Sequence, residues 1–254
     1  MPGTLHLGHL RIPIFGLFAA AGLVGALTLS QRTARHAGLQ PESLWDAGLI
    51  AIIAAFLASR ALLIASDPHD FLRYPILVLE LPSLTYAGLA LTALLTYAYL
   101  RLKHLPLRNV LDAWAPCAAL LLATLALGHF VEGTDAGMPT NLPWGIHTPG
   151  DTVLGRVHPV QLYFLAAWLW LTFDLLRLLR RPHTAGMVLS RALTIGGAMA
   201  FFLDTFAQPT DTFGSAFLDP SQYAGLLCFA IGLWLERREL SALPQPSSQP
   251  QEHV

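Results

Sequence analysis

Long apolar runs, separated by charged or Pro- and Gly-rich breaks, divide most of this sequence. Most of the runs approach the roughly 20 residues that a helix needs to cross a bilayer. The pattern therefore predicts an all-α, polytopic integral membrane protein with about seven transmembrane helices in a single domain, residues 1–240. The predicted spans lie near 12–30, 44–65, 84–100, 110–131, 159–179, 187–206 and 221–235.

Composition agrees with this prediction. Of the 254 residues, 54% are hydrophobic and only 12% are charged, and the mean hydropathy is +0.52. That charged share is about half the share usual in a soluble domain. It excludes an ordinary soluble, collagen-like or nucleic-acid-binding protein. Residues 241–254 differ, because they are rich in Ser, Pro and Gln and cannot form a core, so we expect a disordered cytoplasmic tail there.

The fourth and seventh runs are rich in Ala and Gly, which suits close contacts between helices in lipid. Cys117 and Cys228 both fall in apolar runs. We interpret them as small core residues rather than as a disulfide.

Positive charge is concentrated in alternate breaks between the runs. Short loops rich in Lys and Arg remain in the cytoplasm, and only Arg11, Arg73 and Arg156 fall on the other side. We therefore expect the N-terminus outside and the C-terminus in the cytoplasm. The first run is expected to be an uncleaved anchor, because most of its flanking charge follows it. The 11 cations, of 15, on the predicted cytoplasmic side are Arg32, Arg35, Arg101, Lys103, Arg108, Arg177, Arg180, Arg181, Arg191, Arg237 and Arg238.

Two polar segments are expected on the outer side, near 66–82 and 132–158. The first mixes charged with aromatic residues, which suits a stretch lying at the lipid headgroups, and a polar loop with interfacial aromatics is the alternative. The second is interrupted by Gly and Pro and predicts an irregular loop that returns to the membrane surface. We expect the functional site in these segments.

His129 and Glu132 lie three residues apart near the outer end of the fourth run, on one face of the predicted helix. A carboxylate beside an imidazole orients the ring and stabilises its protonated form, so the pair suits a general base. The alternative is a hydrogen-bonded pair at the membrane interface.

The start of the fifth run brings four polar groups within eight residues: Arg156, His158, Gln161 and Tyr163. Pro159 fits the first turn of a helix, and the positive helix end beside a guanidinium suits a phosphate. The group therefore predicts binding of an anionic headgroup. The alternative is a helix cap with an interfacial tyrosine.

Charged side chains inside predicted spans are costly in lipid unless they face a partner or water. Arg60, in the second run, fits a structural or a functional role equally well. Asp174, in the fifth, is expected to pair with Arg177 at i and i+3. Asp204, in the sixth, is the better candidate for a binding pocket. The spacing of His, Cys, Asp and Glu suggests no metal cluster, and no cofactor is expected.

Several motifs occur in an order that resembles one known family, the bacterial prolipoprotein diacylglyceryl transferases. Residues 5–8 (LHLG) are similar to the opening of that family, 138–145 (MPTNLPWG) to its "RPTDLPWG" loop and 158–163 (HPVQLY) to its "HPSQLY" motif. Residues 208–209 (QP) resemble its "FRQPD" segment, and Gln222 the glutamine that opens its last span. The resemblance covers about residues 5–234, and the family's seven spans and topology agree with those predicted above.

The chain departs from the family at polar positions. Residues 125–137 (LALGHFVEGTDAG) stand where the family has G-R-x-G-N-F-x-N-x-E-x-x-G. This alignment puts Ala126 in place of an arginine, His129 and Glu132 in place of asparagines, and Thr134 in place of a glutamate. Further replacements are Phe15 for a tyrosine, Tyr86 for a histidine, Ala200 and Ala207 for arginines and Asp204 for a glutamate.

The resemblance implies an enzyme that moves diacylglyceryl from phosphatidylglycerol to the lipobox cysteine of prolipoproteins, in the bacterial cytoplasmic (inner) membrane. On this hypothesis His129, Glu132 and Tyr86 are the candidate catalytic residues. The candidate substrate-binding residues are Arg156, His158, Gln161, Tyr163, Asp204 and Arg60. Two alternatives stay open. One is a protein of the same fold that binds a lipid or lipopeptide without transferring it, which Ala126, Ala200 and Ala207 favour. The other is a related transferase with a different donor or acceptor.

Overall fold

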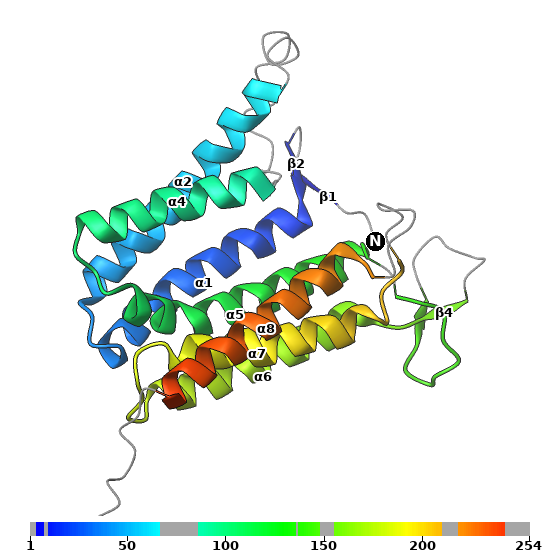
Figure 1. Ribbon diagram of the computed structural model, residues 1–254. Coiled ribbons are helices and arrows are strands. Elements are labelled where there is room, and N and C mark those ends of the chain that lie inside the picture. Colours follow the sequence, from blue (N-terminus) through cyan, green and yellow to red (C-terminus); the bar gives the residue numbers. More distant parts are fainter. Residues whose placement is uncertain are drawn as a thin grey trace, which may run out of the picture.

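The computed structural model describes residues 4–7, 10–66, 86–135, 137–147, 155–209 and 218–241. Over these residues seven helices form a bundle with two short β-hairpins beyond one end (Figure 1). The strands β1 (Thr4–Leu7) and β2 (Leu10–Pro13) pair antiparallel, as do β3 (Ile146–His147) and β4 (Arg156–Val157). The helices are α1 (Ile14–His36), α2 (Pro41–Ser66), α4 (Tyr86–Leu102), α5 (Leu107–Glu132), α6 (Val160–Leu179), α7 (Met187–Asp204) and α8 (Pro220–Ser241).

Each predicted apolar run overlaps one helix, in the same order. Five helices are long and apolar enough to cross a membrane, namely α1, α5, α6, α7 and, within α2, Pro41–Leu62. Ala87–Leu102 of α4 is apolar but shorter. Large apolar side chains also cover the outside of the bundle: Val24 and Leu94 are each 62% exposed. Such a surface suits lipid rather than water, and the prediction of an all-α polytopic membrane protein is confirmed.

Helix α5 lies at the centre of the bundle and packs against α1, α6 and α7. On one flank α2 and α4 pack together beyond α1, and on the other α8 packs on α7. A core of buried side chains, among them Leu44, Val110, Leu171 and Val188, joins α1, α2, α4, α5, α6 and α7.

Small residues allow the close helix contacts that the Ala- and Gly-rich runs predict. Buried alanines of α5 pack in the central region, and Gly22 of α1 faces the side chain of Thr124 in α5. Between α7 and α8, Gly197 and Gly225 approach so closely that a Cβ on Gly197 would collide with the backbone of α8. The absence of side chains therefore sets the distance between these two helices.

Lysine and arginine gather at one end of the bundle, which we call the cationic end. The chain passes there between α1 and α2, between α4 and α5 and between α6 and α7, and α8 also finishes there (Figure 1). The 11 cations of the predicted cytoplasmic loops all belong to these helix ends and connections. The helices thus alternate in direction in the way that the charge pattern requires.

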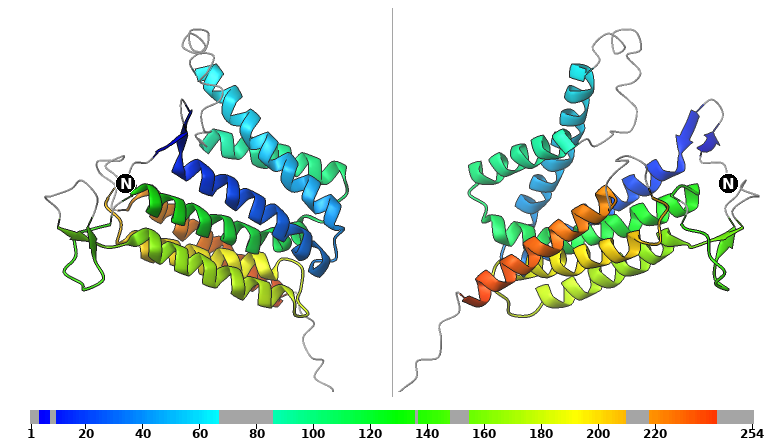
Figure 2. Two further views of the ribbon diagram at one scale, coloured as in Figure 1. Left: turned by 180° about the vertical axis from the view of Figure 1, so that it is seen from behind. Right: turned by 45° about the vertical axis from the view of Figure 1, so that its right-hand side comes forward.

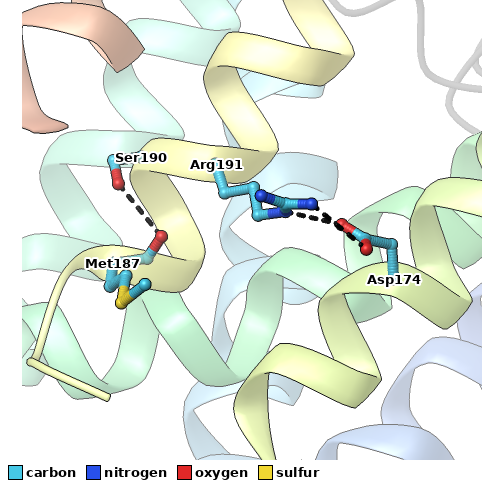
Figure 3. A network of polar contacts seen from close by, with 4 residues as sticks. All are labelled: Asp174, Met187, Ser190 and Arg191. Carbon is cyan, nitrogen blue, oxygen red and sulfur yellow. Dashed lines mark hydrogen bonds and ion pairs between the residues drawn. The ribbon is translucent and has the colours of Figure 1, made fainter.

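Asp174 does not pair with Arg177 as expected. Its carboxylate accepts two hydrogen bonds from Arg191 of α7, from Nε at 2.6 Å and from one terminal nitrogen at 3.3 Å (Figure 3). The i, i+3 spacing was a local argument, whereas the packing of α6 on α7 brings a guanidinium in position for a two-point contact. This ion pair links two helices rather than two turns of one helix.

We expect Asp174→Asn to lower the free energy of unfolding by about 1 kcal/mol, because the pair is partly exposed and such pairs contribute little. Arg177→Gln is the control, and it should leave the free energy unchanged. Thermal unfolding of the purified protein in one detergent measures both. A larger loss from Arg177→Gln would support the local pairing instead.

Candidate active site

The end of the bundle opposite the cationic end, which we call the site end, lies where α5 and α7 finish and α6 and α8 begin (Figure 2). Backbone hydrogen bonds join three chain segments there. Met138 donates its N–H to the carbonyl of Phe206 at 2.8 Å, and His158 donates to the carbonyl of Met138 at 3.0 Å. Residues 137–140, 156–158 and 206–207 are thereby held as one layer beyond the helices.

Gly137 is essential to this layer because a Cβ there would overlap the carbonyl oxygen of His158. The close approach also orients Gln208, which donates from Nε2 to the carbonyl of Gly137 at 3.4 Å. Ala207 forms an antiparallel bridge with Gly137. The sequence predicted an irregular loop here, and the structure confirms irregular backbone with short strand pairings that its Gly and Pro content did not reveal.

His158 and Tyr163 form an aromatic and polar group with Trp144, which belongs to the motif at 138–145, and with Phe206, which the sequence did not single out. Tyr163 accepts a hydrogen bond from Trp144 Nε1 at 2.8 Å, and its hydroxyl lies 3.3 Å from His158 Nδ1. The ring of Phe206 packs against both, with centroids 5.1 Å from His158 and 6.2 Å from Tyr163. Because Trp144 is the donor, the Tyr163 proton remains available for Nδ1 or for a bound anion.

Arg156 and Gln161 flank this group. Arg156 is exposed on β4, where its carbonyl accepts from Thr140, and its guanidinium has no ion pair with the described residues. Gln161 is half-buried in the first turn of α6. The four residues predicted at the start of the fifth run thus lie beside or within one turn of the start of α6. The N–H groups of Val160 and Leu162 already donate to the carbonyls of His158 and Pro159, both at 2.9 Å, so the donors for an anion here are mainly side chains.

His129 is held by the turn that ends α5. Gly133 takes a left-handed conformation (φ 79°), and the chain reverses so that Thr134 and Asp135 return to the ring. Nδ1 of His129 lies 2.9 Å from Thr134 Oγ1 and 3.1 Å from Asp135 Oδ2. The ring also packs on Phe15 of α1, with centroids 4.4 Å apart.

The carboxylate paired with His129 is therefore that of Asp135, and the expected pairing with Glu132 is wrong. Helical spacing placed Glu132 on the same face, but helix α5 ends at that residue, and the left-handed turn at Gly133 brings Asp135 closer. An ionised carboxylate only accepts hydrogen bonds, so Nδ1 carries the proton and Nε2 is left as the acceptor. The His129 side chain is 35% exposed, so Nε2 can meet a ligand.

Three predicted residues lie apart from these groups. Asp204 accepts a hydrogen bond from Ser221 Oγ at 2.7 Å and so ties the end of α7 to the first turn of α8. Arg60 is buried in α2 with its guanidinium over the ring of Phe56, and α2 packs against α1 and α4 rather than against α6. Tyr86 begins α4, and its side chain lies outside the described residues.

Other predictions also fall outside the described residues. They concern residues 67–82 of the first outward segment, residues 148–154 of the second and the tail beyond Ser241. Within the described residues, no group of three or more His, Cys, Asp and Glu is placed to hold a metal ion.

Comparison with known proteins identifies the family. The family model for prolipoprotein diacylglyceryl transferase matches residues 2–236, nearly the whole chain. The chain belongs to this family. The family is one of transferases, and the resemblance drawn from the sequence motifs is confirmed.

Individual transferases of the family align along most of their length. A phosphatidylglycerol–prolipoprotein diacylglyceryl transferase of Clostridium tetani is 25% identical over 239 residues, covering 92% of this chain and 96% of its own. The transferases of the same name from Cupriavidus metallidurans and Cupriavidus pinatubonensis are each 30% identical, covering 92% and 94% of this chain and 87% and 92% of their own.

Two residues that the motif comparison pairs with arginines of the family pattern lie near the candidate site. Ala126 is buried in α5 three residues before His129. Ala207 contributes its backbone to the layer at the site end. Small side chains of this member of the prolipoprotein diacylglyceryl transferase family are therefore close to His129 and to the layer.

Proposed function

We propose that this protein transfers the diacylglyceryl group of phosphatidylglycerol to the lipobox cysteine of prolipoproteins, a step of lipoprotein biosynthesis. The observation that carries the proposal is the family match over residues 2–236. Relatives that bear this activity in their names align over 86–97% of their own length in several cases. The position of the polar groups, all beyond the site end of an apolar bundle, suits a reaction on a lipid headgroup.

We place the protein in the bacterial cytoplasmic membrane with the site end outside. The proposal rests on the charge pattern, because the cationic end carries the Lys and Arg that keep short loops in the cytoplasm. Residues 1–240 form one domain in this proposal, and 241–254 form a cytoplasmic tail.

His129 is the proposed general base. In the transfer, the thiol loses its proton to Nε2 of His129, and the thiolate sulfur then forms a bond to the terminal glyceryl carbon. The bond between that carbon and the phosphate oxygen breaks, and glycerol phosphate leaves. Asp135 holds Nδ1 and stabilises the imidazolium that forms. Glu132, half-buried one turn after His129, is proposed to assist the base. Tyr86, at the start of α4, stays a proposed catalytic residue.

The headgroup is proposed to bind at the start of α6. Arg156 contributes a guanidinium that can contact the phosphate, and Tyr163 and His158 contribute hydrogen-bond donors. Gln161 offers an amide on the same helix turn. Asp204 and Arg60 are proposed to act more remotely, Asp204 by fixing the start of α8 and Arg60 from within α2, where its guanidinium is buried over the ring of Phe56.

Two other functions have specific observations in their favour. Ala126, Ala200 and Ala207 replace residues that are arginines in the family pattern, and loss of one preorganised donor typically costs about a hundredfold in rate. This favours a protein that binds lipid or lipopeptide without transfer. His129, at a position where the family pattern has an asparagine, favours a transferase with another donor or acceptor.

A transfer assay distinguishes these functions. The full chain is purified and incubated with phosphatidylglycerol and a peptide that contains a lipobox cysteine. We expect the peptide to gain the mass of diacylglyceryl, with no gain when serine replaces that cysteine. No adduct from folded protein would contradict the proposal, and phosphatidylglycerol binding that Arg156→Ala abolishes would then favour the binding protein. An adduct only with another phospholipid would favour a different donor.

A further inference from the structure

An apolar groove of about 420 Å³ runs along α7 on the side bordered by α6 and α8. Its floor is a stripe of α7 at helical spacing, formed mainly by Ile195, Ala198, Met199 and Phe202. Ala167 of α6 and Phe229 of α8 border it. Thr194 is the one lining residue with a polar side chain, and its hydroxyl lies against Gly232 of α8. The groove therefore presents hydrocarbon to its contents.

The groove occupies one half of a membrane span. Its lining along α7 extends from Thr194 to Leu203, a rise of about 14 Å at 1.5 Å per residue. A bilayer has a hydrocarbon core of about 30 Å, so this length corresponds to one leaflet. It is the half of α7 that leads to the site end, since α7 finishes at Asp204.

The end of the groove that is nearer the site end of the bundle adjoins the proposed headgroup site. The helix ends at Asp204, and the N–H of Phe206 turns back to the carbonyl of Leu203 at 3.1 Å. The ring of Phe206 then packs on His158 and Tyr163. A single helical turn of α7 therefore connects the last apolar residue of the groove with the polar group above it.

The volume of the groove suits a single hydrocarbon chain. A chain of methylenes, with neighbouring carbons about 4 Å apart, needs roughly 200 Å³ over roughly 14 Å of length. The groove, at about 420 Å³, accommodates one such chain.

We propose that this groove binds one fatty acyl chain of the phospholipid whose headgroup lies at Arg156, His158 and Tyr163. The inference rests on the proposed function for the identity of the lipid, and it adds the place where the donor is held within the membrane. Contact of the chain with Ala198, Met199 and Phe202 fixes the depth of the lipid, so that its glyceryl carbons are positioned below the polar residues.

Photo-cross-linking tests the groove without turnover. The full chain in lipid nanodiscs is given phosphatidylglycerol that carries a diazirine midway along one acyl chain. We expect cross-links at Met199, Phe202 or Phe229. Ala198→Phe, which fills the groove, should reduce them about tenfold. The control is Ala166→Phe, at a similar depth on α6 but exposed, and it should leave them unchanged.

Cross-links spread equally over exposed residues outside the groove, such as Leu94, would overturn the inference, because that is the pattern of bulk lipid around any membrane protein. Equal labelling of the groove in the wild type and Ala198→Phe would also overturn it.

A kinetic comparison separates this inference from the proposed function. For Ala198→Phe we expect the KM for long-chain phosphatidylglycerol to rise about tenfold, with the KM for a short-chain phosphatidylglycerol unchanged. Equal KM values for wild type and variant on both lipids would refute the groove while leaving the transfer activity standing. If no transfer occurs but the cross-links in the groove persist, the proposed function is contradicted while binding of an acyl chain in the groove is supported.

Discussion

Replacing His129 with alanine should lower the rate of diacylglyceryl transfer by about a hundredfold or more, because a positioned general base contributes roughly 10² to 10⁴. Asp135 and Thr134 hold Nδ1, so Nε2 is the atom that accepts the thiol proton. The measurement is the initial rate of adduct formation on the lipobox peptide. Thermal unfolding of the same preparation checks that the fold is intact, since His129 lies at a helix end and is partly exposed.

Two further variants distinguish the base pair in the structure from the one expected on helical spacing. Asp135→Asn keeps an acceptor for Nδ1 but removes the charge that stabilises the imidazolium, so the rate should fall about tenfold. Glu132→Gln is the matched control and should have a smaller effect. If Glu132→Gln lowered the transfer rate strongly and Asp135→Asn left it unchanged, Asp135 would not be the residue that orients the base. A near-normal rate for His129→Ala would remove His129 from the chemistry.

Asp112→Ala should destabilise the fold more strongly than Asp174→Asn. The carboxylate of Asp112 is 1% exposed in α5, and it accepts hydrogen bonds from the backbone N–H groups of Gly186 at 2.6 Å and Leu189 at 2.8 Å. Gly186 is the N-cap of α7 and has no side chain to satisfy these donors. Asp112 therefore caps α7 from another helix, and its negative charge meets the positive helix end.

Loss of this carboxylate leaves buried backbone donors without an acceptor, at a cost of about 1–3 kcal/mol for each group. We expect the free energy of unfolding to fall by about 3 kcal/mol and the thermal midpoint by about 10 °C. Asp46→Ala, at an exposed position of α2, is the control and should not shift the midpoint. A shift of the thermal midpoint by only about 1–2 °C in Asp112→Ala, which is typical of a surface substitution, would contradict the capping role.

Asp112 and Asp174 show what the sequence can and cannot predict about charged residues within membrane spans. The high cost of a charge in lipid predicts that each needs a partner, and both have one. The partners, however, come from α7 in both cases, at Gly186 and Leu189 for Asp112 and at Arg191 for Asp174. Spacing along one helix could not identify them, because the contacts depend on how α7 packs against α5 and α6.

The sequence likewise predicted only some of the residues that form the candidate site. The start of α6 was predicted from local residue types, and His158 and Tyr163 do lie together there. Trp144 and Phe206, which complete the group, come from positions 19 residues before and 43 residues after Tyr163. They carry no charge and resemble ordinary interfacial aromatic side chains, and the motif at 138–145 that contains Trp144 does not specify which residues it contacts. Only the layer of backbone hydrogen bonds brings them to the same place.

The sequence by itself determined the helices, their order, their alternating direction and the family. These features depend on hydropathy, on the position of Lys and Arg and on short motifs, which are all local along the chain. The tertiary structure alone decided the carboxylate that faces His129, the cap on α7, the partner of Asp174 and the apolar groove beside the site. The physical reason is that each of these depends on atoms brought within a few ångströms by helix packing or by one left-handed turn, and sequence periodicity does not specify such contacts.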